Sequence, residues 1–264
     1  MKKISLSQAI IILSLSLVIT LSGCSEKWDI EEKGVPRFVK VNYIELDNID
    51  RISRFRSSEG HDYSDSHENC RRMKHYYHPY ENINWGTVKI FSPVAGTITV
   101  IFYDGIGASV HIESSEYPAY KFIIFHMNLD IKYSQGDYVE AGEQLGTHIG
   151  SKTMSDIAVR VKEGTFTKRL VSYFDVMTDD LFVEYQYRGI SNRQVMIIPE
   201  TARDSDPCTC SGQSFTSRGS IESWINLSHI QPASMLWCIN ELQAIPQSLC
   251  LLGLKGFIQG SCTV

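Results

Sequence analysis

The glycine pattern between Tyr133 and Gly150 constrains the fold of this chain more than any other feature. Gly136 and Gly142 stand where turns are expected, and apolar residues on either side of them supply the flanking strands. Ser92-Pro93-Val94-Ala95-Gly96 is a second turn, with proline and glycine where each is geometrically useful. Further strands are expected at 97–102, 108–113, 120–126 and 155–161. Short strands separated by turns predict a mostly β domain.

The bulk composition is that of an ordinary globular protein. The 264 residues are enough for one substantial domain or two small ones, with 43% hydrophobic and 21% charged residues. The net charge of -5 leaves no basic stripe, so nucleic acid is excluded as an expected partner.

The N-terminus is expected to be a targeting segment. Positive charge at Met1-Lys2-Lys3 precedes an apolar run that ends in Leu21-Ser22-Gly23-Cys24. This tetrapeptide resembles the lipobox of bacterial lipoproteins, which implies a signal peptide over 1–23 and an acylated Cys24. Acyl chains would anchor the chain to the membrane, with 24–39 as a tether. An extracytoplasmic location follows, and Ser25 resembles outer-membrane routing (periplasmic face) in a cell with two membranes.

Several side chains are candidates for a polar site. His61 and Asp65 are four residues apart, His126 ends an apolar strand, and Asp156 begins another. His67, His75 and His78 crowd into the neighbouring polar stretch, which is typical of a metal site or of a solvated surface loop.

The motif Gly136-Asp137-x-Val139-x-x-Gly142-x-x-Leu145-Gly146 resembles the lysostaphin-type (LytM-like) zinc metallopeptidases. The segment 92–98 resembles the preceding half-motif of that family, and the resemblance covers about 60–162. It implies a LytM-like β-sandwich, a barrel-sandwich hybrid with a duplicated hybrid motif, over 40–175. The glycine pattern alone is shared with biotinyl and lipoyl carrier domains, so it indicates the fold more firmly than the activity.

The resemblance also assigns roles to individual residues. His61 and Asp65 match the family's first metal-binding motif, although Tyr63 replaces its usual glycine. His126 matches a catalytic histidine. The closing His-x-His motif falls on Asp156-Ile157-Ala158, so Asp156 holds a catalytic position and Ala158 stands where a zinc ligand is expected.

A catalytic zinc ion needs three protein ligands and a bound water. Beside His61 and Asp65, the third ligand could come from several residues, and the sequence does not choose among Asp156, His148, His67, His75 and His78.

Two functions remain open. The first is a lipid-anchored zinc metallopeptidase that hydrolyses peptide cross-links of peptidoglycan. The second is a catalytically inactive LytM-like module that binds the cell wall or activates a partner hydrolase, which the missing His-x-His motif favours. Peptidoglycan or an envelope hydrolase is therefore the expected partner, besides the membrane.

The C-terminal part differs in character from the predicted β domain. Thr178 is expected to N-cap a helix, and 176–227 reads as a helical appendage. The tail 228–264 is apolar and nearly uncharged, which suggests a disordered or frameshifted extension. A short helix is expected over Cys70-Tyr77, and Cys70 could form a disulfide with Cys208 or Cys210.

Overall fold

The computed structural model describes residues 26–150, 153–164 and 167–228. The predicted signal peptide, the lipidation site Cys24 and the tail beyond residue 228 lie outside these ranges. Within them, no helix has both the length and the apolar character needed to cross a membrane.

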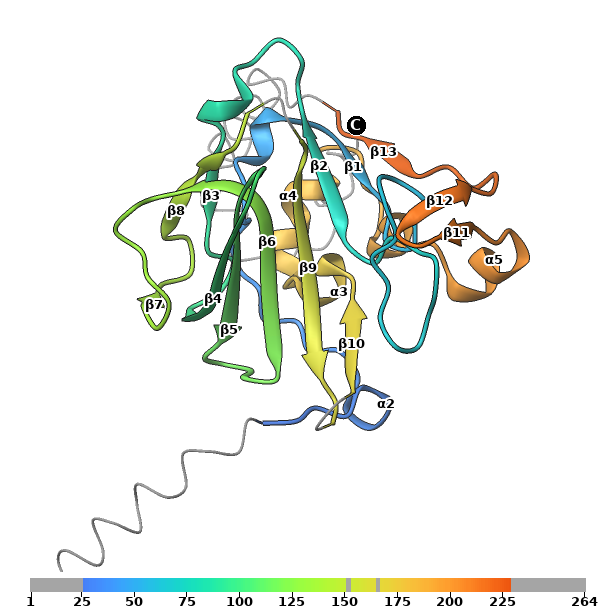
Figure 1. Cartoon of the computed structure of the whole chain (residues 1–264), viewed down its shortest axis with the longest axis horizontal. Helices are drawn as coiled ribbons and strands as arrows, with labels where there is room; N and C mark the ends of the chain where they lie inside the picture. The colour runs from blue at the N-terminus through green and yellow to red at the C-terminus, as the bar shows by residue number, and fades with distance from the viewer. Residues whose placement is uncertain (1–25, 151–152, 165–166, 229–264) are drawn as a thin grey trace, which may run out of the picture.

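One large antiparallel sheet dominates the molecule (Figure 1). Its strands follow the order β13-β1-β2-β9-β6-β5-β4-β7, while β10 pairs with β9, and β8 pairs with both β6 and β3. The strands of this sheet are β1 (Ile49–Ser53), β2 (His75–Pro79), β3 (Lys89–Phe91), β4 (Gly96–Asp104), β5 (Gly107–Ser114), β6 (Tyr120–Leu129), β7 (Tyr138–Val139), β8 (Gln144–His148), β9 (Ser155–Lys162), β10 (Lys168–Val171) and β13 (Trp224–Asn226). The prediction of a mostly β fold is confirmed.

The glycine motif works as its pattern predicts. Gly136 has φ of +99°, which glycine adopts without the steric cost that a side chain adds. Gly146 on β8 lies so close to β6 that an added Cβ would stand 1.9 Å from the backbone oxygen of Asn128. Val139 and Leu145 are fully buried between these glycines. The motif therefore fixes a turn and a close contact between strands.

The helices are short. They are α2 (Ile30–Lys33), α3 (Tyr173–Val176), α4 (Asp179–Gln186) and α5 (Glu200–Ser205), with 3-10 turns η1 (Leu46–Asn48), η2 (Trp85–Thr87) and η3 (Arg193–Met196). Thr178 caps α4 as predicted, since its hydroxyl accepts a hydrogen bond from the backbone N–H of Leu181.

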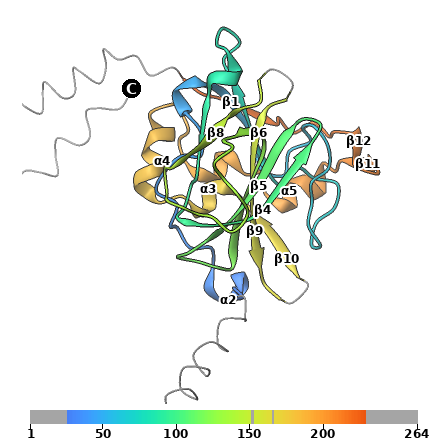
Figure 2. The ribbon, with the colours of Figure 1, turned by 60° about the vertical axis from the view of Figure 1, so that its left-hand side comes forward.

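The main hydrophobic core lies between the sheet and α3 and α4. Ile124 of β6 and Val159 of β9 belong to the same buried cluster as Phe174, Leu181 and Tyr185 of the two helices. Figure 2 shows these helices on the side of the molecule away from the hairpin β11 (Thr209–Ser211) and β12 (Ser214–Ser217). The segment 176–227 thus contains helices first and strands afterwards, and its β13 pairs with β1.

The stretch Cys70-Tyr77 is not a helix, so that prediction was wrong. Its second half forms β2, which is hydrogen-bonded to β1 on one side and β9 on the other. Two strand partners outweigh weak helical propensity in a run of histidine and tyrosine, of which tyrosine favours strands. Cys70 forms a disulfide with Cys210, one of its two expected partners, and this bond ties the loop before β2 to β11.

Candidate functional site

The face of the sheet opposite the main core carries the candidate site. Ile157, Val159 and Val161 of β9 point into the main core, so the alternating residues Asp156 and Ala158 point the other way. The loop from Ser57 to Arg72 lies over this second face. A smaller apolar cluster joins the two, and it consists of Phe55, Met73, Ile123, Ala158 and Leu170, with Tyr63, Phe125 and Ile197 at its edge.

Asp156 is fully buried at the centre of this face. One carboxylate oxygen accepts a hydrogen bond from Nδ1 of His126 at 3.0 Å, and the other forms an ion pair with the ammonium of Lys74. Burial alone would raise the pKa of Asp156, but Lys74 and His126 more than offset this effect and lower it to about 2. Asp156 is therefore a buried carboxylate anion with both oxygens engaged.

Lys74 precedes β2 and is 2% exposed. Its ammonium stands 3.8 Å from the ring centre of Phe125 and 4.8 Å from that of Tyr63. Burial lowers the pKa of Lys74 to about 8, with Asp156 opposing this shift. The lysine remains largely protonated at neutral pH, held by one carboxylate and by aromatic faces that attract cations.

His126 occupies an irregular position in β6. Its φ of 55° lies in the left-handed region, which residues with a side chain rarely adopt. The pairing of β6 with β5 shifts register here, between Ile124 and Met127. At the same point β6 changes its other neighbour, from β9 up to Phe125 to β8 from Met127 onward. This bulge turns the His126 imidazole toward Asp156.

His61 lies at the edge of the same site but is oriented differently. Its Nδ1 donates to the backbone carbonyl of Asp62 at 2.8 Å. Burial lowers the pKa of His61, and the positive charges of Arg72 and Lys74 lower it further, with the backbone bond opposing them. The guanidinium of Arg72 is itself buried, donates to the Tyr76 hydroxyl and stacks 4.3 Å from the centre of that ring.

Asp65, the other residue of the predicted metal pair, organises the loop backbone. One oxygen accepts the N–H groups of His67 and Glu68, at 2.8 and 3.1 Å. The other accepts the N–H of Leu170 on β10 at 2.7 Å. Asp65 thus fastens the loop to β10.

The remaining candidate ligands also have other partners. His75 is buried between the Ser53 carbonyl and the Ser172 hydroxyl, at 2.7 and 2.8 Å. His148 is buried on β8 and accepts the N–H of Gly150 through Nδ1, which makes Nε2 the protonated nitrogen. His78 packs edge-on against Trp85.

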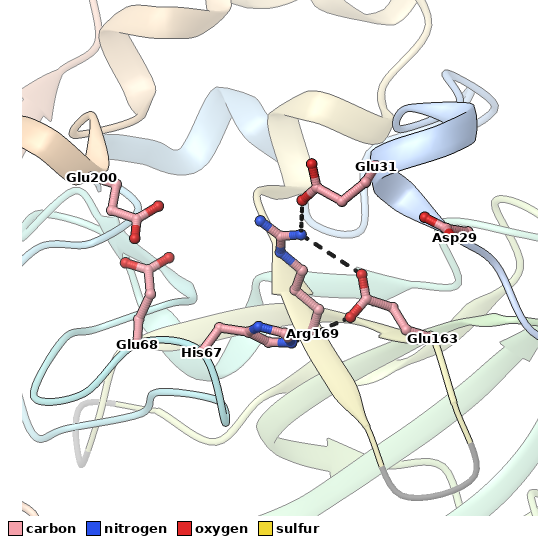
Figure 3. Close-up of a pocket in the computed structure, with 7 residues that line it drawn as sticks. All are labelled: Asp29, Glu31, His67, Glu68, Glu163, Arg169 and Glu200. Carbon is pink, nitrogen blue, oxygen red and sulfur yellow. Dashed lines mark hydrogen bonds and ion pairs between the residues drawn. The ribbon is translucent and has the colours of Figure 1, made fainter.

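His67 belongs to a different part of the surface. It faces Glu163 at 3.2 Å in a cavity of about 560 Å³ (Figure 3). We call this cavity the outer pocket; it is lined by Asp29, Glu31, His67, Glu68, Glu163, Arg169 and Glu200.

These contacts do not fit the zinc site that the family resemblance implies. Asp65 and Asp156 have their oxygens engaged by backbone N–H groups or by Lys74 and His126, and Ala158 supplies no donor. Across the described ranges, no three His, Cys, Asp or Glu side chains are grouped so that they could hold a metal ion.

The sequence interpretation missed Lys74 and Arg72. Both lie in the stretch that was expected to be a short helix, where their spacing had no evident meaning. Read as an extended segment leading into β2, Arg72, Lys74 and Tyr76 alternate, and their side chains meet on one face. The alternation of cationic and aromatic residues was the feature of the sequence that could have placed Arg72 and Lys74 on one face of a strand.

No protein-family model and no curated protein matches the chain. Several solved structures are similar to it. The expected resemblance is confirmed. A glycyl-glycine endopeptidase lytM from Ruminococcus gnavus is similar over 39% of this chain and 43% of its own, with 20% identity and a TM-score of 0.31. Lysostaphin is similar over 44% of this chain and 51% of its own, with 14% identity and a TM-score of 0.29.

The SpoIIQ–SpoIIIAH pore-forming complex is similar over more of its length. The match covers 57% of this chain and 96% of that one, with 12% identity and a TM-score of 0.38. The chain spans about half the length or less of the first two proteins. At these identities the likeness concerns the fold alone, and the chemistry of the site has to be argued from its own residues.

Proposed function

We propose that this chain is a lipid-anchored, extracytoplasmic LytM-like module that binds the cell wall without hydrolysing it. The observation that carries the proposal is the network of Lys74, Asp156 and His126, which engages the carboxylate at the centre of the site. We call these three residues the central network. A peptidase of this family needs donors free to hold zinc and an activated water. Here the oxygens of Asp65 and Asp156 are engaged by groups of the protein instead, and Ala158 offers no donor.

The anchoring and location rest on the N-terminal sequence pattern. A signal peptide ending at Gly23 and an acylated Cys24 would tether the folded part by the stretch 24–39. Peptidoglycan is the partner that a module of this fold would meet there.

The hairpin between β4 and β5 offers a contact surface beside the site. Phe102, Tyr103 and Ile106 are 59%, 65% and 42% exposed, which is unusual for large apolar side chains so close together in sequence. Gly107 at the base of this tip packs on the backbone of His126 and Met127. The tip therefore projects next to the central network.

Sedimentation with purified peptidoglycan tests the proposal. The full chain in detergent should pellet with the sacculi, while the turbidity of the suspension stays constant with and without added zinc. The double variant Phe102→Ser/Tyr103→Ser should pellet less. Tyr187→Ser is the matched control, because Tyr187 is also 65% exposed but follows α4.

Zinc-dependent clearing of the suspension would show that the chain is a hydrolase and would refute the proposal. A chain that stays in the supernatant would also contradict it, and would leave activation of a partner hydrolase as the reading to pursue.

A further inference from the structure

The ammonium group of Lys74 lies at the centre of this site, beside Asp156. The family resemblance sets Ala158 where the third zinc ligand is expected. β2 and β9 pair antiparallel with His75 opposite Ile157 and Tyr76 opposite Asp156. Continued by one residue, this register sets Lys74 opposite Ala158. Because the side chain of Ala158 is short, space remains beside Asp156 on this face of the sheet, and the Lys74 side chain occupies it.

The surroundings of Lys74 compensate its charge from several sides. Isolated buried cations are costly, and they persist in proteins when they are paired. The Lys74 ammonium has the Asp156 carboxylate as its ion-pair partner and the rings of Phe125, Tyr63 and Tyr76 within 5.5 Å. At 2% exposure, water contributes little to this compensation.

The rest of the site is arranged around the same charge. His126 binds the oxygen of Asp156 that Lys74 leaves open. Arg72 adds a second buried cation on this side, bonded to the Glu59 carbonyl and the Tyr76 hydroxyl. A divalent ion entering here would meet two positive charges and a carboxylate already neutralised.

We infer that the Lys74 ammonium is the resident cation of this centre, that it takes over the charge-balancing role of a metal ion, and that it keeps divalent metals out. The inference concerns the ion alone and holds whether or not the module binds peptidoglycan.

Thermal unfolding of the full chain in detergent, without metal, tests the pairing. Lys74→Met leaves the Asp156 charge buried without its partner and should lower Tm by about 10 °C. Adding Asp156→Asn should recover at least half of that loss, because the uncompensated charge disappears. Lys89→Met is the matched control: Lys89 pairs with Glu45 at 3.2 Å but is 50% exposed, so its Tm should change by about 2 °C or less. Losses that simply add in the double variant would overturn the pairing.

Titration with zinc tests the exclusion of metal. Zinc should leave the Tm of the wild-type chain unchanged. It should raise the Tm of the double variant Lys74→Ala/Ala158→His, in which the ammonium is gone and a third donor stands beside Asp156 and His126. A wild-type chain that zinc stabilises, with the gain lost in Asp156→Asn, would refute the inference. So would a Lys74→Ala/Ala158→His chain that zinc leaves unchanged. These outcomes do not depend on sedimentation with peptidoglycan.

Discussion

Two clusters of charged residues in this protein contain the same kinds of group and differ in burial. The central network joins Lys74, Asp156 and His126 on the inner part of the sheet face, where Asp156 is fully buried. The outer pocket joins Arg169 to Glu31 and Glu163 near the end of the β9–β10 hairpin (Figure 3). The Glu31 side chain is 79% exposed there. Buried charges depend on one another for compensation, whereas water compensates exposed ones. The comparison predicts that equivalent substitutions have unequal effects.

The largest effect is expected at Asp156. Asp156→Ala leaves the Lys74 ammonium buried without its carboxylate, and breaking such a pair costs about 3–5 kcal/mol. Denaturant unfolding at pH 7 measures the loss. A loss of less than about 1 kcal/mol would contradict this prediction, because exposed ion pairs contribute that little.

The disulfide comes next, because it holds the loop that covers the central network. The double variant Cys70→Ser/Cys210→Ser releases this loop from β11 and should lower the free energy of unfolding by about 2–4 kcal/mol. Denaturant unfolding of the variant and of the oxidised wild-type chain gives the difference. Equal stability would mean that Asp65 and the backbone bonds of the loop suffice to hold it.

The pH dependence of the free energy of unfolding should reveal the buried carboxylate of the central network. The pKa of Asp156 is about 2 in the folded chain and about 3.9 in an unfolded one. A lowered folded-state pKa contributes stability that is present above about pH 4 and is lost as the pH falls through about 2. The wild-type chain should lose roughly 2 kcal/mol more than Asp156→Asn over this window. Parallel pH profiles of the two chains would contradict the assignment.

The smallest effect is expected in the outer pocket. Arg169→Ala removes the contacts to Glu31 at 2.5 Å and Glu163 at 3.7 Å. Partly exposed pairs contribute about 1 kcal/mol or less, and salt screens them. The free energy of unfolding of Arg169→Ala and of the wild-type chain, measured in low and in high salt, checks both the size of the loss and its screening. A larger, salt-independent loss would show that the outer pocket is as tightly coupled as the central network.

The strands could be predicted because their signals are local. Alternation along β9, the apolar run of β6 and the cap at Thr178 are properties of consecutive residues, and the structure follows them. The exception is β2. Its residues favour strands only weakly in isolation, and its pairing with β1 and β9 joins segments far apart in the chain.

The site was predicted unevenly for the same reason. His126 and Asp156 are indeed brought together, as the family resemblance implied by matching both to catalytic positions. His61 and Asp65 fit a metal motif by spacing, but spacing does not state what each side chain faces. Asp65 bonds to the N–H of Leu170, which is 105 residues away.

The sequence by itself determined the β architecture, the turns at its glycines and the absence of a donor at Ala158, because each depends on the chemistry of one residue or its near neighbours. Only the tertiary structure decided that Lys74 fills the centre of the site. Its charge could be buried only where a carboxylate from β9 and rings from β6 and the covering loop converge, and that convergence exists only once the sheet has formed.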